Sequence, residues 1–157
     1  MFLNETEATL TAGDNLQLEG VFNPVDATLT DLTWKSTNED VAVVSDDGEV
    51  TALTSGSTTI IATTIYGLTA ECDISVRIPA SKIKVNVSSV TLKKGKTKQL
   101  TVKIYPSNAT DKPKFSSLNK KVATVTSKGR ITAKNKGTTY IKVMVGNCIK
   151  KVKVKVK

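Results

Sequence analysis

Apolar and polar residues alternate along most of this chain with a period of two. The clearest runs are residues 16–22, 72–76 and 152–156, in which every second residue is apolar or glycine. Such alternation is typical of strands with one face on a core and the other in water. Apolar residues do not recur at helical spacing over three turns anywhere in the chain. The sequence therefore predicts an all-β fold.

A hairpin pattern occurs twice, at residues 41–52 and 122–133. Each copy has a short apolar strand, a turn that ends in glycine, and a second strand of alternating character. The Asp47-Gly48 pair suits a tight turn because both residues tolerate positive φ. A further glycine follows each hairpin at the same distance, at Gly56 and Gly137.

The similarity between the two copies extends well beyond the hairpin. The matching segments are 13–18 with 95–100, 23–28 with 105–110, and 34–38 with 115–119. The repeat is therefore about 80 residues long and covers almost the whole chain. About seven short strands per copy, separated by turn residues, predict a sandwich of two antiparallel sheets. Trp34 aligns with Phe115, and we expect these rings to fill the centre between the sheets.

The two copies predict two tandem domains, residues 1–79 and 80–157. Pro79 marks the boundary because proline cannot donate to a strand ladder, and the short linker favours a semi-rigid rod.

Met1 aligns with Ile83, so either the first strand of copy one is clipped or the chain was cut from a longer array. No signal peptide is visible in residues 1–5. No apolar run reaches the ~20 residues that cross a bilayer, so we expect no membrane insertion.

Charge separates the two copies sharply. Residues 1–79 hold 13 acidic and two basic residues, whereas residues 80–157 hold 21 basic residues and a single acid, Asp111. The net charge of +9 therefore combines an acidic domain of −11 with a basic domain of +20. Opposite charges of this size could attract neighbouring copies head to tail, which is one hypothesis for a partner.

The lysines of the second copy are the candidate binding residues. One group crowds a turn, and another lines the exposed face of the last strand. Such a cationic stripe would attract an anionic wall polymer such as teichoic acid, an acidic glycan or an acidic protein surface. The alternative is solubility and protection of a sheet edge. Scarce arginines and exposed aromatics argue against nucleic acid as the partner. The candidates are Lys93, Lys94, Lys96, Lys98, Lys150, Lys151, Lys153 and Lys155, with Lys157 at the end of the same strand.

Other chemistry finds little support in the sequence. The chain has no histidine, no nucleophile elbow and no phosphate-binding loop, so we expect neither an enzyme nor a cofactor. The acidic residues between Asn38 and Glu49 could offer oxygens to Ca²⁺, but a solvated loop explains them as well, and no metal site is expected. Cys72 and Cys148 form no CxxC pair and are read as buried free thiols.

The ordered motifs resemble the bacterial immunoglobulin-like group 2 domain. The shared elements are a Gly-x₃-Gln-Leu segment, Pro-x-x-Ala, an aromatic strand that ends in Asn, and a hairpin with Gly-x-[Ile/Val]-Thr-Ala. The resemblance implies an Ig-like β-sandwich without shared catalytic residues. In copy one the elements lie at Pro24 and Ala27, 34–38, 41–44, 48–52 and 56–60; in copy two they lie at 95–100, 106–109, 117–125, 129–133 and 137–141.

The resemblance implies an extracellular setting, since the family occurs in intimin- and invasin-type adhesins, other surface proteins, glycan-associated enzymes and phage virions. We therefore expect a non-catalytic spacer, display or adhesion module at the bacterial cell surface, in contact through its basic domain with a glycan, anionic polymer or protein. A virion decoration or host-attachment domain is the second hypothesis. A carbohydrate-binding module of an extracellular enzyme is the third, although its tyrosines, Tyr66, Tyr105 and Tyr140, are spread along the sequence.

Overall fold

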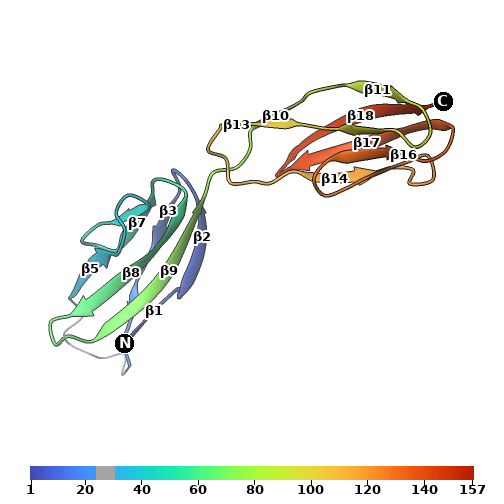
Figure 1. Cartoon of the computed structure of the whole chain (residues 1–157). Coiled ribbons are helices and arrows are strands. Elements are labelled where there is room, and N and C mark those ends of the chain that lie inside the picture. The colour runs from blue at the N-terminus through green and yellow to red at the C-terminus, as the bar shows by residue number, and fades with distance from the viewer. Residues whose placement is uncertain (24–30) are drawn as a thin grey trace. The chain divides into compact units, whose positions relative to one another are not determined.

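The chain folds into two compact β units, shown in Figure 1. A computed structural model describes residues 1–23 and 31–157, so the Pro24 to Ala27 motif lies outside the described residues. Unit 1 comprises Met1–Ile78 and unit 2 comprises Pro79–Lys157. The described residues contain strands and turns without a helix, and so no helix that could cross a membrane. The all-β prediction is confirmed.

The described part of unit 1 forms a sheet of order β2-β9-β8-β5, a sheet of order β3-β7-β6, and the short pair β1-β4. The pairings are antiparallel except that β2 runs parallel to β9. The strands are β1 (Phe2–Leu3), β2 (Glu7–Thr11), β3 (Asn15–Gln17), β4 (Gly20–Val21), β5 (Leu32–Ser36), β6 (Ala42–Val44), β7 (Glu49–Ala52), β8 (Gly56–Thr64) and β9 (Thr69–Arg77).

Unit 2 repeats this topology strand for strand. Its sheets have the orders β11-β18-β17-β14 and β12-β16-β15, and β10 pairs with β13. Only β11 and β18 are parallel within this unit. The strands are β10 (Lys82–Val85), β11 (Ser89–Leu92), β12 (Thr97–Gln99), β13 (Val102–Tyr105), β14 (Lys114–Ser117), β15 (Ala123–Val125), β16 (Arg130–Ala133), β17 (Gly137–Val145) and β18 (Cys148–Val156).

Each unit has a single core between its sheets, built from the inward residues of the alternating strands. In unit 2, Ile141 and Val154 from one sheet and Ile131 from the other are fully buried in one cluster. In unit 1, Ile60 and Cys72 occupy the corresponding core. Small and β-branched side chains fill both cores because aromatic residues make up only 4% of the chain.

The repeated hairpins use glycine where the sequence predicts it. Gly129 ends the β15–β16 turn with a φ of +80°, a conformation that L residues rarely adopt. The ring of Phe115 lies against this glycine, since a Cβ there would be 2.8 Å from the Phe115 Cζ atom. The ring packs against the core but is only partly buried, so it does not fill the centre between the sheets as the sequence predicts.

The first strand of unit 2 crosses from one sheet to the other at Asn86. Before the crossing β10 pairs with β13, and after it β11 pairs with β18. The Asn86 side chain fixes the crossing: its Oδ1 accepts from the Thr101 N–H at 3.1 Å, and its Nδ2 donates to the Gln99 carbonyl at 3.3 Å. Asn4 makes the equivalent bonds in unit 1. This crossing leaves part of β18 without a neighbour on one side.

Candidate functional site

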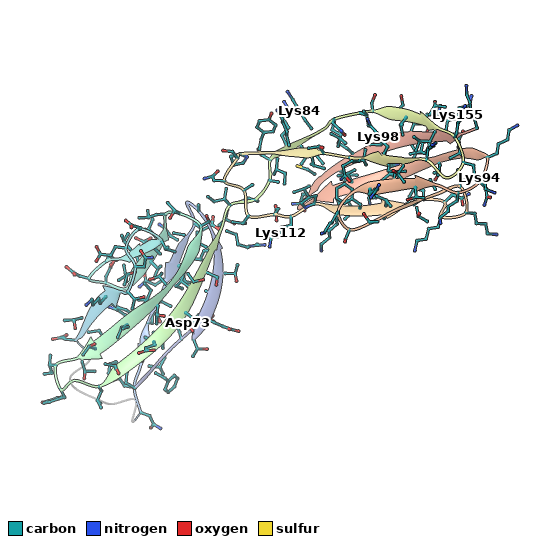
Figure 2. The ribbon with its side chains drawn as sticks, viewed as in Figure 1. Asp73, Lys84, Lys94, Lys98, Lys112 and Lys155 are labelled. Carbon is teal, nitrogen blue, oxygen red and sulfur yellow. The ribbon has the colours of Figure 1, made fainter. Side chains whose placement is uncertain are left out.

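Strand β18 holds a row of lysines on the outer side of its sheet, of which Lys155 is labelled in Figure 2. Lys151, Lys153 and Lys155 are exposed, while Val152 and Val154 between them are buried. Alternate residues of a strand lie about 6.7 Å apart, because each residue advances the chain by ~3.3–3.4 Å. The row therefore presents an ammonium group at regular short intervals along a stiff support.

The neighbouring strand β17 adds groups directly opposite these lysines. Lys142 pairs with Lys151, Tyr140 with Lys153, and Thr138 with Lys155. Lys142 is half-buried, and Tyr140 keeps 40% of its surface exposed. Side chains at directly opposed positions have Cβ atoms about 4.5–5.5 Å apart, and like charges there are destabilising. The pairing of Lys142 with Lys151 thus places two positive charges side by side.

The outer strands extend the same surface. On β11, Ser89 lies opposite Lys153 and Thr91 lies opposite Lys155. On β14, exposed Lys114 lies opposite Met144 of β17. We call this surface the lysine face; its members are Lys114, Lys142, Lys151, Lys153, Lys155 and Tyr140.

No acidic side chain of unit 2 is free to neutralise the lysine face. Asp111 is the only acid of the unit, and its Oδ2 accepts a hydrogen bond from the Ala80 N–H at 2.8 Å. Asp111 also lies against Gly146, where a Cβ would meet its carboxylate. The lysine face therefore keeps its positive charge.

The group of lysines that the sequence places at a turn lies around the β11–β12 turn and on β12. Lys93, Lys94 and Lys96 are exposed around the turn between β11 and β12, where the Lys96 N–H bonds the Lys93 carbonyl. Lys94 Nζ donates to Asn135 Oδ1 at 3.2 Å. Lys98 lies on β12, which belongs to the other sheet. Lys98 is thus on a different sheet from the row on β18, whereas Lys93 follows the end of β11, whose Leu92 carbonyl accepts from the Lys157 N–H.

Lys150 differs from the expectation that it lines the same exposed face as its neighbours. It shares the inward register of Val152 and pairs with buried Val143. It is nevertheless exposed, and it lines an open groove beside β18. The explanation that these lysines protect a sheet edge does not apply from Lys153 onward. There β11 pairs with β18, so β18 is an inner strand.

Sequence reasoning missed Lys142, Tyr140 and Lys114. A signal for the first two exists: the two-residue Gly146-Asn147 loop between alternating runs fixes the register of a hairpin. Counting back from that loop places Lys142 opposite Lys151. Lys114 has no such signal, because its position depends on the pairing of strands distant in sequence.

The equivalent face of unit 1 carries the opposite charge. Glu7 on β2 lies opposite Asp73 on β9, and Asp73 Oδ1 accepts from the Thr59 hydroxyl at 2.8 Å. Glu71, two residues before Asp73, is also exposed. The same fold thus presents an acidic face in one unit and a basic face in the other.

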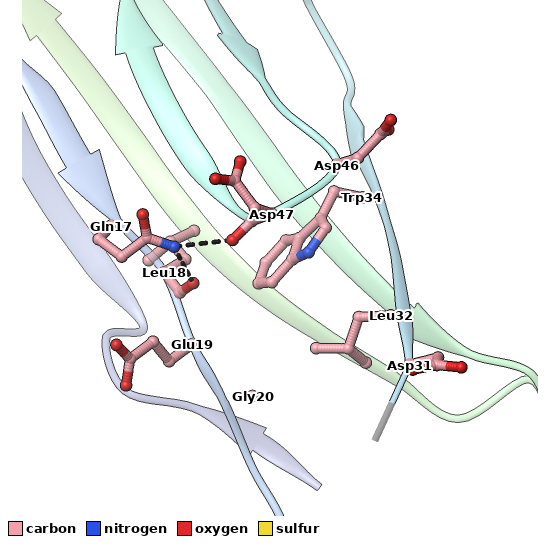
Figure 3. A pocket seen from close by; sticks show the side chains of 9 residues that line it. All are labelled: Gln17, Leu18, Glu19, Gly20, Asp31, Leu32, Trp34, Asp46 and Asp47. Atoms are coloured by element: carbon pink, nitrogen blue, oxygen red, sulfur yellow. Dashed lines mark hydrogen bonds between the residues drawn. The ribbon is translucent and has the colours of Figure 1, made fainter. Parts of the chain in front are cut away.

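Unit 1 also has an open hollow of about 560 Å³, shown in Figure 3, beside the Trp34 ring. Its wall includes Gln17, whose Nε2 donates to the Asp47 carbonyl at 2.8 Å. The Ser45 hydroxyl bonds the Asp47 carboxylate and lowers its pKa. In residues 1–23 and 31–157 no three His, Cys, Asp or Glu side chains are grouped to hold a metal. The loop oxygens considered for Ca²⁺ therefore form no described site.

The cysteines lie in different units and are both free thiols. Cys72 is fully buried in the core of unit 1, and this burial raises the pKa of its thiol to about 11. Cys148 is half-buried, and its Sγ donates to the Ala80 carbonyl at 3.4 Å. Both fit the role of small packing residues.

The sequence model of the bacterial Ig-like domain (group 2) matches this chain twice, at residues 1–72 and 79–156. An uncharacterized protein of Clostridium acetobutylicum is 29% identical over 148 residues, which cover 92% of this chain and 15% of that protein. The alpha-L-arabinofuranosidase of Bifidobacterium longum is 41% identical over 69 residues, which cover 43% of this chain and 6% of the enzyme. The chain thus spans less than a fifth of the length of these relatives.

Among solved structures, a C-terminal fragment of intimin in complex with the translocated intimin receptor is similar to this chain. The TM-score is 0.48 at 16% identity, and the match covers 96% of this chain and 60% of the fragment.

Proposed function

The chain belongs to the bacterial Ig-like domain (group 2) family, and we propose that it is a non-catalytic module of a bacterial cell-surface protein that holds an anionic polymer on the lysine face of unit 2. The two Ig-like β-sandwiches supply the support, since neither the family resemblance nor the described residues point to a catalytic constellation. Unit 1 acts as a spacer that displays unit 2.

The pairing of Lys142 with Lys151 carries this proposal. Two opposed lysines, continued by Lys153 and Lys155 along the strand, repel one another in the free protein. Solubility alone does not require such an arrangement, because lysines interspersed with acids would also keep the surface charged. A bound polyanion removes the repulsion and releases its own counterions, so both effects favour binding.

Tyr140 favours a glycan over a simple polyphosphate as the polymer. Its residue lies opposite Lys153 of β18 and two positions before Lys142 on β17, and 40% of its surface is exposed. An aromatic ring offers an apolar surface and a hydroxyl together, which suits the face of a sugar ring. An acidic wall or capsule polysaccharide therefore fits the surface better than a chain of phosphates alone.

The test compares two charge-matched variants in binding to purified wall teichoic acid and to hyaluronate. In the face variant Lys151, Lys153 and Lys155 are changed to Gln; in the control variant Lys98, Lys103 and Lys128, which are exposed outside the face, are changed to Gln. By isothermal titration, the affinity for the polymer should fall at least tenfold in the face variant and less than threefold in the control variant. Equal losses would overturn the proposal, as would an absence of binding by the wild-type chain to both polymers.

A further inference from the structure

A second surface of unit 2 follows from the crossing of its first strand. β11 pairs with β18 only from Lys153 to Val156. β10, which precedes the crossing, pairs instead with β13 in the other layer. The first half of β18, residues 148–152, therefore has β17 on one side and no strand bonded to it on the other.

The backbone of this half strand has groups directed at the unpaired side. Within the parallel pair, the Lys153 N–H donates to the Ser88 carbonyl, and the Lys157 N–H donates to the Leu92 carbonyl, both at 3.0 Å. Odd-numbered residues of β18 thus point their N–H and C=O groups away from β17, because these directions alternate along a strand. Ile149 and Lys151 have the same direction, so their backbone groups face the open side.

A groove lies along this open side. Its volume is about 410 Å³, and the apolar residues Ile83, Val85, Val87 and Val152 form part of its lining. Ile83 and Val152 are buried core residues, so the floor is rigid. The remaining lining residues are Lys82, Lys84, Lys150, Lys151 and Ser88.

The charge of the groove is positive. The side chain of Lys84 lies over the ring of Tyr105, with its Nζ atom 5.9 Å from the ring centre. The carboxylate of Asp111, the one acid of the unit, is bonded to the Ala80 N–H. The single negative charge of Asp111 cannot balance the four lysines that line the groove.

We propose that this groove binds an acidic peptide segment of a partner protein in extended conformation, as an added strand beside residues 149–151 of β18. The backbone groups of Ile149 and Lys151 bond the peptide main chain, and its alternate side chains point to opposite faces. Apolar side chains meet the floor of the groove while carboxylates meet the lysines on its rim. The occupant is acidic because the groove supplies only positive charge.

This site shares Lys151 with the lysine face but differs from it otherwise. It uses Lys150, which has the inward register, and the open edge of the sheet rather than its outer surface. A polyanion that lacks peptide N–H and C=O groups cannot form the hydrogen bonds of an added strand along that edge. The proposal of peptide binding is therefore tested independently of polymer binding.

The first test uses a synthetic peptide of alternating valine and glutamate, seven residues long and blocked at both ends. Two N-methylated versions carry the methyl group either on the valines or on the glutamates. Added-strand binding predicts that one version binds at least tenfold more weakly while the other is little changed, because only every second N–H faces the sheet. Equal affinity of the two versions, or no binding of the parent peptide at low salt, would overturn the proposal.

The second test uses hydrogen exchange and charge reversal. Peptide binding should slow exchange of the Ile149 and Lys151 amides while leaving those of β12 unchanged. Lys150→Glu should weaken binding roughly tenfold, whereas Lys98→Glu, an exposed lysine of β12, should change it less than twofold. Unchanged exchange at Ile149 and Lys151, or an equal effect of both substitutions, would show that general charge attraction acts in place of strand addition.

Discussion

The indole ring of Trp34 lies against the backbone of Gly48 in unit 1. A Cβ atom on Gly48 would be 2.8 Å from Trp34 Cζ2 and 2.6 Å from the Leu18 carbonyl oxygen, and the φ of Gly48 is +86°. Phe115 and Gly129 stand in the same relationship in unit 2. The repeated hairpin is therefore joined to the opposite sheet by an aromatic ring seated on a glycine.

We predict that Gly48→Ala destabilises unit 1 by about 2–4 kcal/mol, because it adds both a steric clash and an unfavourable φ. Urea unfolding followed by the fluorescence of Trp34, the single tryptophan, reports on unit 1. The control is Gly67→Ala, which has a φ of +77° with no atom within 4 Å of its Cβ. It should cost only about 1–2 kcal/mol. Equal losses for the two variants would contradict the close contact.

Much of this fold follows from local sequence signals. The alternation of apolar and polar residues predicts the strands, and the glycine that ends the turn within each hairpin predicts a position of positive φ. The lysine face was only partly predictable, because Lys142 and Tyr140 join it only through the pairing of β17 with β18. The open half of β18 was not predictable, because it depends on the position at which a distant strand changes sheets.

The thiol of Cys72 should add a pH dependence to the stability of unit 1. Burial raises its pKa in the folded unit to about 11, above the ~8.5 of an unfolded chain. The neutral thiol therefore stabilises unit 1 fully below the unfolded pKa, and this contribution is lost as pH rises from about 8.5 to 11. Cys72→Ala should be less stable overall, with a shallower decline in stability over this range by urea unfolding. Equally steep declines in the stability of the wild-type unit and of the Cys72→Ala unit over this pH range would contradict a contribution from Cys72.

Thiol labelling should distinguish the two cysteines. Cys148 is half-buried and Cys72 is fully buried, so a chromogenic disulfide reagent at pH 8 should modify Cys148 at least tenfold faster. Cys72 should react only as fast as unit 1 opens. Cys148→Ser should remove the fast phase alone. A fast phase that survives this substitution would place an accessible thiol at Cys72.

The opposite faces of the two units predict self-association at low salt. The acidic face around Glu71 and Asp73 in one copy complements the lysine face of another. Sedimentation velocity should show larger species in 20 mM salt and monomer in 1 M salt, where the screening length falls to ~3 Å. Asp73→Lys should weaken the association, while Asp14→Lys, on a turn outside this face, should not. A monomer under both conditions would exclude it.

The salt dependence of polymer binding tests the central claim most directly. If the lysine face holds the polyanion, the logarithm of the association constant falls linearly with the logarithm of salt concentration, with a slope set by the number of cations engaged. The variant in which Lys151, Lys153 and Lys155 are changed to Gln should show a slope smaller by about two to three. The variant in which Lys98, Lys103 and Lys128 are changed should keep the wild-type slope. Equal slopes for the two variants would contradict the lysine face as the binding surface.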